Sequence, residues 1–118
     1  LVLEDYDYGI WYMDALEHPR KYEGRQVTVE VKVYPVNEER AHAYVAGREA
    51  MVCCSDDTSL IGMWVYTADQ KPRPLSWVRL TGRIRVEYDE DFGGEVCALE
   101  EIGREVLEHH DDEYVYFT

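Results

Sequence analysis

Apolar and polar residues alternate with a period of two along several stretches of this chain. The clearest stretch is RQVTVEVKVYPV, in which valines alternate with polar side chains. Such alternation is typical of a β-strand with one face in the core and the other in solvent. The pattern predicts five strands, over residues 25–36, 41–54, 60–67, 77–88 and 95–107. The side chains that we expect to be buried are Val27, Val29, Val31, Leu80, Ile84 and Val86.

Helical spacing is confined to the N-terminal part of the chain. Trp11, Leu16 and Tyr12 fall on one side of a helix, and Pro19 ends the pattern. We therefore predict one short helix over residues 9–18.

Five strands and one short helix favour a mainly β fold, specifically a small five-stranded OB-like Greek-key barrel. Gly82, inside the fourth predicted strand, allows the tight bend that a small barrel requires. Residues 1–8 are acidic and rich in tyrosine. We expect them to form a lead-in segment ahead of a barrel domain at 9–118.

Charge narrows the classes of partner. The chain carries 25 acidic and 12 basic residues among 118, for a net charge of −13. Such a surface repels phosphate groups, so we expect no nucleic acid as a partner, and anionic lipid surfaces are disfavoured as well. Tyr44, Trp64 and Trp77 could stack on bases, but the basic groove that should accompany them is missing, so we expect them in the core. Cationic or metallic partners are favoured instead.

The hydrophobic content bears on how the chain folds. Hydrophobic residues make up 46% of the chain, enough to fill one core without a disulfide or a metal. No apolar stretch approaches the roughly 18 residues that a membrane span needs.

The least ordinary motif is GREAMVCCSDD, with the adjacent thiols of Cys53 and Cys54. Neighbours in a regular strand point to opposite faces, so both thiols can reach one ion only where the backbone leaves strand geometry. With Asp56 or Asp57 they could then hold zinc or another thiophilic cation. We favour structural packing, with metal binding and redox chemistry as alternatives, because no CxxC spacing is present. Arg48 either lowers the pKa of a thiol or pairs with an acid.

Three further side chains could bind a metal. Cys97 lies in a predicted core strand, where a buried and inert thiol is the simpler interpretation. His109 and His110 precede two aspartates, although consecutive histidines near a terminus are usually solvated. These three residues are weaker candidates for metal ligands. No motif places a base beside a thiol, so no catalytic residue is assigned and the chain is not expected to be an enzyme.

A longer series of motifs resembles a known family. HPRKYEGRQVTVEVKVY, AGREAMVCCSDD, IGMWVY, WVRLTGRI and a closing YVY follow one another in this order. Together they resemble the soluble C-terminal domain of the bacterial YcgQ-like permease-subunit family, over residues 12–117. The most specific element of the resemblance consists of Arg48, Met51, Val52, Cys53, Cys54 and Asp56. The resemblance implies a membrane region in the full protein, an integral-membrane permease as partner, and no enzymatic activity.

On the basis of this resemblance we expect a non-catalytic accessory or regulatory domain of a membrane permease subunit, and the double cysteine is the place where we expect a ligand site. The domain would be the soluble part of a membrane-anchored bacterial protein and would contact the membrane only through a region outside this chain. The alternative is a thiolate metal-binding domain for a soft cation such as zinc, and no other cofactor is expected. A barrel that binds oligosaccharide or nucleic acid is the second alternative, which the charge disfavours.

Overall fold

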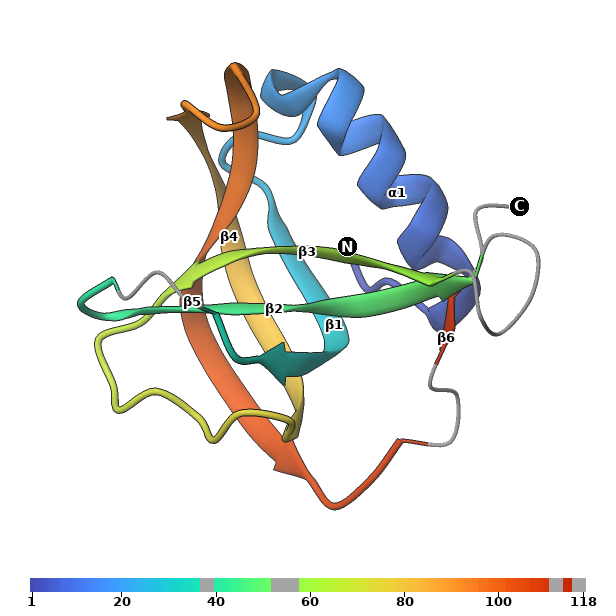
Figure 1. The fold of residues 1–118 in the computed structure, drawn as a ribbon, viewed down its shortest axis with the longest axis vertical. Coiled ribbons are helices and arrows are strands. Elements are labelled where there is room, and N and C mark those ends of the chain that lie inside the picture. The colour runs from blue at the N-terminus through green and yellow to red at the C-terminus, as the bar shows by residue number, and fades with distance from the viewer. Residues whose placement is uncertain (37–39, 52–57, 111–113, 116–118) are drawn as a thin grey trace.

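A computed structural model of the chain describes residues 1–36, 40–51, 58–110 and 114–115 (Figure 1). The predicted mainly β fold with one N-terminal helix is confirmed, and all five predicted strands are present. A sixth strand of two residues near the C-terminus was not predicted. The elements are α1 (Asp5–Glu17), the 3₁₀ turn η1 (Pro19–Lys21), β1 (Gln26–Tyr34), β2 (Ala43–Met51), β3 (Thr58–Tyr66), β4 (Trp77–Asp89), β5 (Gly94–Leu107) and β6 (Tyr114–Val115).

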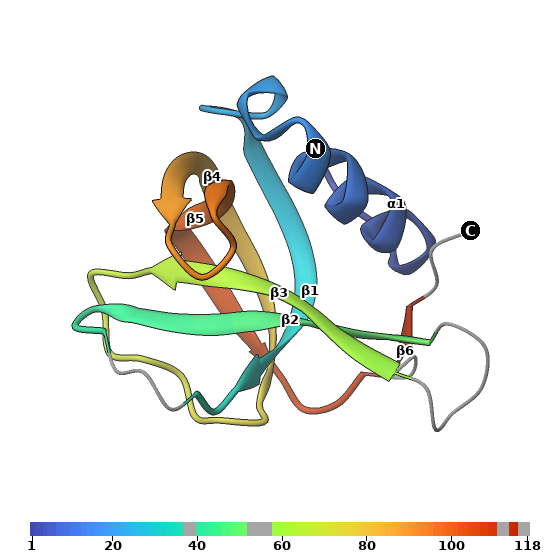
Figure 2. The ribbon, with the colours of Figure 1, turned by 45° about the horizontal axis from the view of Figure 1, so that its top comes forward.

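The strands form one sheet in the order β1-β4-β5-β3-β2-β6. β1 also pairs with β2, so the ladders that run from β1 through β4, β5, β3 and β2 return to β1. Neighbouring strands are antiparallel except for the parallel pairs β3–β5 and β2–β6. Figure 2 shows α1 lying beside this sheet, next to β1. None of the helices in the described residues is long and apolar enough to span a membrane.

The alternating residues of β1 and β4 fill the core, as the sequence pattern predicts. Five of the six side chains expected there are buried, whereas Val86 is only half-buried because it lies toward the turn of the β4–β5 hairpin, beyond the fully buried part of β4. Tyr44 is buried as expected, but the expectation is wrong for Trp64 and Trp77, which are half-buried. Arg40 packs over the ring of Trp64.

The helix begins at Asp5, so the predicted start at residue 9 is wrong, and residues 5–8 of the predicted lead-in segment are helical. The backbone N–H of Glu4 donates to the Asp7 carboxylate at 3.4 Å. The negative side chains in the first turn also interact favourably with the positive end of the helix dipole. Tyr8, Trp11 and Ala15 bury one face of the helix against the sheet.

Two glycine positions shape the sheet. The pairing of β4 with β5 shifts register between Thr81 and Gly82, which is the irregularity expected at the predicted bend. Gly47 of β2 lies opposite Gly62 of β3. A Cβ on Gly47 would stand 2.3 Å from the carbonyl oxygen of Ile61, so only glycine allows these strands to approach as they do.

Candidate functional site

The predicted site divides into residues that the structure describes and residues that it does not. Cys53, Cys54, Asp56 and Asp57 lie outside the described residues. Arg48 lies on β2, shortly before that segment.

Arg48 is 1% exposed and occupies the centre of a charged cluster. Its Nη1 donates to Asp5 Oδ1 at 2.7 Å and to the backbone carbonyl of Glu30 at 3.3 Å. Its guanidinium also lies 5.2 Å from the centre of the Trp77 ring. A buried guanidinium needs such partners because desolvation of an isolated charge is costly. The cluster therefore fixes the N-terminus of α1 to β1 and β2.

His110 joins the same cluster from the C-terminal part of the chain. Its ring stacks on Trp77 with centroids 4.5 Å apart, and its side chain is 7% exposed. Its Nε2 lies 3.0 Å from Glu30 Oε1 and 3.3 Å from Asp5 Oδ1. His109, in contrast, is exposed. The expectation that both histidines are solvated is therefore wrong for His110, because an aromatic ring and two carboxylates surround it.

This cluster contains side chains of the types that bind metals, but arginine side chains already form ion pairs with its carboxylates. Arg48 binds Asp5, and Arg79 donates two hydrogen bonds to Glu30 Oε2, at 3.0 and 2.6 Å. Across the described part of the chain, no group of three or more His, Cys, Asp or Glu side chains is arranged to hold a metal ion. Within those residues, the cluster is a network of ion pairs and hydrogen bonds that stabilises the fold.

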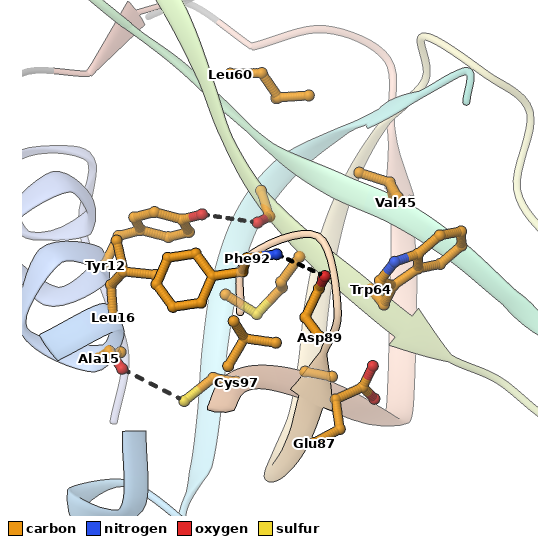
Figure 3. A pocket seen from close by; sticks show the side chains of 14 residues that line it. Tyr12, Ala15, Leu16, Val45, Leu60, Trp64, Glu87, Asp89, Phe92 and Cys97 are labelled. Atoms are coloured by element: carbon orange, nitrogen blue, oxygen red, sulfur yellow. Dashed lines mark hydrogen bonds between the residues drawn. The ribbon is translucent and has the colours of Figure 1, made fainter. Parts of the chain in front are cut away.

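A pocket of about 280 Å³ opens between α1, β3 and the β4–β5 hairpin (Figure 3). Its walls are mostly apolar. Tyr12 and Leu16 come from α1, Met63 and Trp64 from β3, and Phe92 from the hairpin tip. Side chains from distant parts of the sequence therefore surround one concave site.

Internal hydrogen bonds hold two walls of the pocket in place. The Tyr12 hydroxyl donates to the carbonyl of Gly62 at 3.0 Å, which fixes the helix wall, and burial raises the pKa of this phenol. At the hairpin, Asp89 Oδ1 accepts the backbone N–H groups of Asp91 at 2.9 Å and Phe92 at 3.1 Å. Phe92 is thus positioned by a turn although the residue is 54% exposed.

The carboxylate of Glu87, at the opposite wall, also has partners within the protein. It accepts a hydrogen bond from the Tyr66 hydroxyl at 2.7 Å and from Arg40 Nη1 at 3.2 Å. The same Arg40 guanidinium covers the Trp64 ring at 4.1 Å. These groups are paired with one another, so they shape the pocket, and the contacts that remain for a ligand are mostly apolar.

Cys97 also lines the pocket, so the expected inert core thiol is half-buried instead of fully buried. Its Sγ contacts the backbone carbonyl oxygens of Ala15 at 3.8 Å and Pro19 at 3.6 Å. Burial raises the pKa of the thiol to about 11, so the thiol stays protonated near neutral pH. A protonated thiol is a poor nucleophile and a poor metal ligand.

The sequence patterns single out Arg48, His110 and Cys97, but they indicate neither the charged cluster that contains the first two nor the pocket that Cys97 lines. Phe92 stands in a turn and Tyr12 in an unexceptional helix, while Met63 and Trp64 belong to the strand with the least regular alternation. One signal was available for the cluster: an arginine inside an apolar strand needs a buried partner.

Comparisons with known proteins identify the family of the chain. Neither the curated proteins nor the solved structures gave a match. A model of the DUF1980 C-terminal domain matches residues 1–117, which is nearly the whole chain. The chain therefore belongs to the DUF1980 C-terminal domain family.

Proposed function

We propose that this chain is a non-catalytic binding domain that serves as an accessory part of a membrane permease subunit. The observation that carries the binding role is the apolar pocket between α1, β3 and the β4–β5 hairpin. The association with a permease rests on the resemblance of the sequence motifs to the YcgQ-like family. On this proposal the parent protein is anchored in a membrane and this domain receives a ligand outside the bilayer.

The strand pairings support an OB-like barrel as the framework of the site. The ring of pairings β1-β4-β5-β3-β2 with a parallel β3–β5 pair is the arrangement expected for five strands closed on themselves. OB folds bind ligands on the face of their second and third strands, near the loop between the fourth and fifth. The pocket occupies this region, with Val45 on β2, Met63 on β3 and Phe92 between β4 and β5.

The size and chemistry of the pocket favour binding over catalysis. Its volume of about 280 Å³ is close to the lower end of the usual range for small-molecule sites, roughly 300–1,000 Å³. It therefore suits a small ligand or a single ring. Cys97 is protonated and Glu87 is paired with Arg40 and Tyr66, so neither is poised as a nucleophile or a general base.

Charge favours a ligand that combines an apolar body with a positive group. The net charge of −13 attracts cations to the surface around the pocket, while the apolar walls hold the uncharged part. The pocket also relates to the double cysteine through the sequence, because Leu60 lines it and lies three positions after Asp57. A ligand in the pocket would accordingly lie close to the strand that follows the cysteine segment.

The test uses 4-phenylbutylamine as a probe, with its binding followed by NMR chemical-shift changes of the labelled domain. Phe92→Ala removes one wall of the pocket and should weaken binding at least about fivefold, as expected for loss of an aromatic contact. Tyr88→Ala is the matched control, since Tyr88 is an exposed aromatic of the same hairpin that does not line the pocket. Shift changes that map outside the pocket, or equal affinities of the two variants, would show that the binding role is wrong.

Two further measurements separate this proposal from its alternatives. Stoichiometric zinc that is bound by the domain and lost after joint Cys53→Ser and Cys54→Ser substitution would establish the metal-binding alternative instead. Co-purification of the full-length protein with an integral-membrane permease from bacterial membranes tests the accessory role. Purification without any permease would contradict the accessory role. The binding role of the pocket would then still be tested separately, by the binding of 4-phenylbutylamine.

A further inference from the structure

α1 presents large apolar side chains on two opposite faces. One face packs against the sheet through Tyr8 and Trp11. On the other face Tyr6 is 72% exposed, Ile10 54% and Met13 38%. Their spacing of four and three residues places these three side chains in one line along the helix. We call this line the outer stripe.

The outer stripe differs from scattered apolar residues on a protein surface. Single exposed leucines or valines are ordinary, whereas a contiguous exposed row is typical of an interaction site. A helix that is apolar on both sides is typical of one enclosed between two layers. The sheet is the first of these layers. Among the described residues there is no second layer over the outer stripe, since its three residues remain exposed.

Acidic residues border the outer stripe without any basic residue on the helix. Residues 4–17 contain five acids and no Lys or Arg. Asp5 binds Arg48 and Asp14 binds Lys21, so these two carboxylates are neutralised by the protein. Glu17 continues the line of the outer stripe one turn beyond Met13 and is exposed. It also stands in the last turn, where carbonyl groups already carry partial negative charge and a cation is favoured.

We propose that the outer stripe is a docking surface for an amphipathic helix of a partner protein, one whose apolar row is flanked by Lys or Arg. The apolar row would cover Tyr6, Ile10 and Met13, and the basic residues would meet Glu17 and the negative end of α1. This surface lies opposite the buried face of α1 and goes beyond the proposed pocket, so either can exist without the other.

The charges argue against two other occupants. An anionic membrane would be repelled by the acids of the helix, whereas helices that lie on membranes carry basic residues beside their apolar face. A second copy of this chain in a symmetric dimer would bring acidic helices of the same sequence together. A basic amphipathic helix alone matches both the apolar row and its acidic border.

The test uses a fluorescein-labelled amphipathic peptide of roughly five helical turns, with a leucine row flanked by lysines. Its binding to the domain is followed by fluorescence anisotropy at about 0.15 M salt, where long-range attraction is largely screened. Ile10→Asp places a charge in the middle of the outer stripe and should weaken binding at least about tenfold. Ile102→Asp is the matched control, because Ile102 is 55% exposed on β5, and it should change affinity less than about twofold. Circular dichroism of both variants confirms that they are folded.

Several outcomes would overturn the proposal. They are equal binding by the Ile10→Asp and Ile102→Asp variants, equal binding of a peptide with glutamates in place of lysines, and no binding at all. Sedimentation could also show a dimer that Ile10→Asp dissociates, which would assign the outer stripe to a second copy of the chain. Binding to vesicles of phosphatidylcholine and phosphatidylglycerol that Ile10→Asp abolishes would assign it to a lipid surface instead.

Discussion

Replacing Gly47 with alanine tests the close approach of β2 and β3, on which the position of the pocket depends. The added Cβ would lie 2.3 Å from the carbonyl oxygen of Ile61 and 2.4 Å from the Cα of Gly62. Non-bonded carbon atoms prefer separations of roughly 3.5–4.0 Å. Both obstacles are backbone atoms, so no side chain can rotate away. The two strands must separate by about 1 Å at this point.

The expected cost has two parts. Overpacking a well-packed site costs roughly 1–3 kcal/mol, and a clash with backbone on the paired strand belongs at the upper end of that range. The separation would also disturb carbonyl groups that anchor the helix, since Ile61 accepts from the Tyr8 hydroxyl at 3.1 Å and Gly62 from Tyr12. One weakened hydrogen bond adds about 1 kcal/mol. We expect Gly47→Ala to lower the free energy of unfolding by about 4 kcal/mol.

Urea unfolding followed by circular dichroism measures this loss. For a domain of this size the slope is roughly 2 kcal/mol per molar urea, so the midpoint should fall by about 2 M. Gly103→Ala is the control, because a Cβ there meets nothing within 4 Å and should change stability by no more than about 0.5 kcal/mol. The loss of stability in Gly62→Ala should lie between the losses in these two variants, because the closest atom to the added Cβ would be 2.9 Å away. A Gly47 variant as stable as the Gly103 variant would refute the reasoning.

Two more predictions concern the chemistry of the surface and the pocket. In a chain with Cys53→Ser and Cys54→Ser, iodoacetamide should modify Cys97 slowly at about pH 8 and faster toward pH 11, since burial raises the pKa of this thiol to about 11. As the pH rises, the thiol of the unfolded chain loses its proton at a lower pH than the thiol of the folded chain. The contribution of Cys97 to stability should therefore be constant below roughly pH 9 and decline as the pH rises toward 11. Rapid modification at about pH 8 would contradict both statements. Single-stranded DNA should not bind near physiological salt because of the net charge of −13, and micromolar or tighter binding would show that the charge argument is wrong.

The strands were predictable because their signal is local. In β1 and β4 every second residue is apolar, and a strand with one buried face needs no other information. The irregular pairing at Gly82 was predictable for the same reason, since a glycine within such a pattern often marks an irregularity. Val86 departs from the expectation because alternation shows which face a residue takes but not how far the core extends along the strand.

The site residues were harder to predict because their neighbours come from distant parts of the chain. Arg48 meets Asp5 across 43 positions, and Tyr12 meets Gly62 across 50. Alternation places Arg48 within β2 but does not indicate which carboxylate lies across from it. The burial of His110 likewise depends on Trp77, which the sequence pattern places only in a strand. Pairwise contacts of this kind follow from the topology of the sheet, which the strand pattern alone does not determine.

The missed start of α1 has a different cause, and the cause itself carries information. Amphipathic helices are recognised by a polar face, and α1 lacks one because Tyr6, Ile10 and Met13 interrupt the side opposite the core. The pattern therefore looked helical only around Trp11. Places where local pattern and global fold disagree are often sites of function, since a sequence selected for folding alone would make them consistent. A soluble, isolated helix would gain from polar residues at Tyr6 and Ile10, so their apolar character favours a partner over solvent on that face.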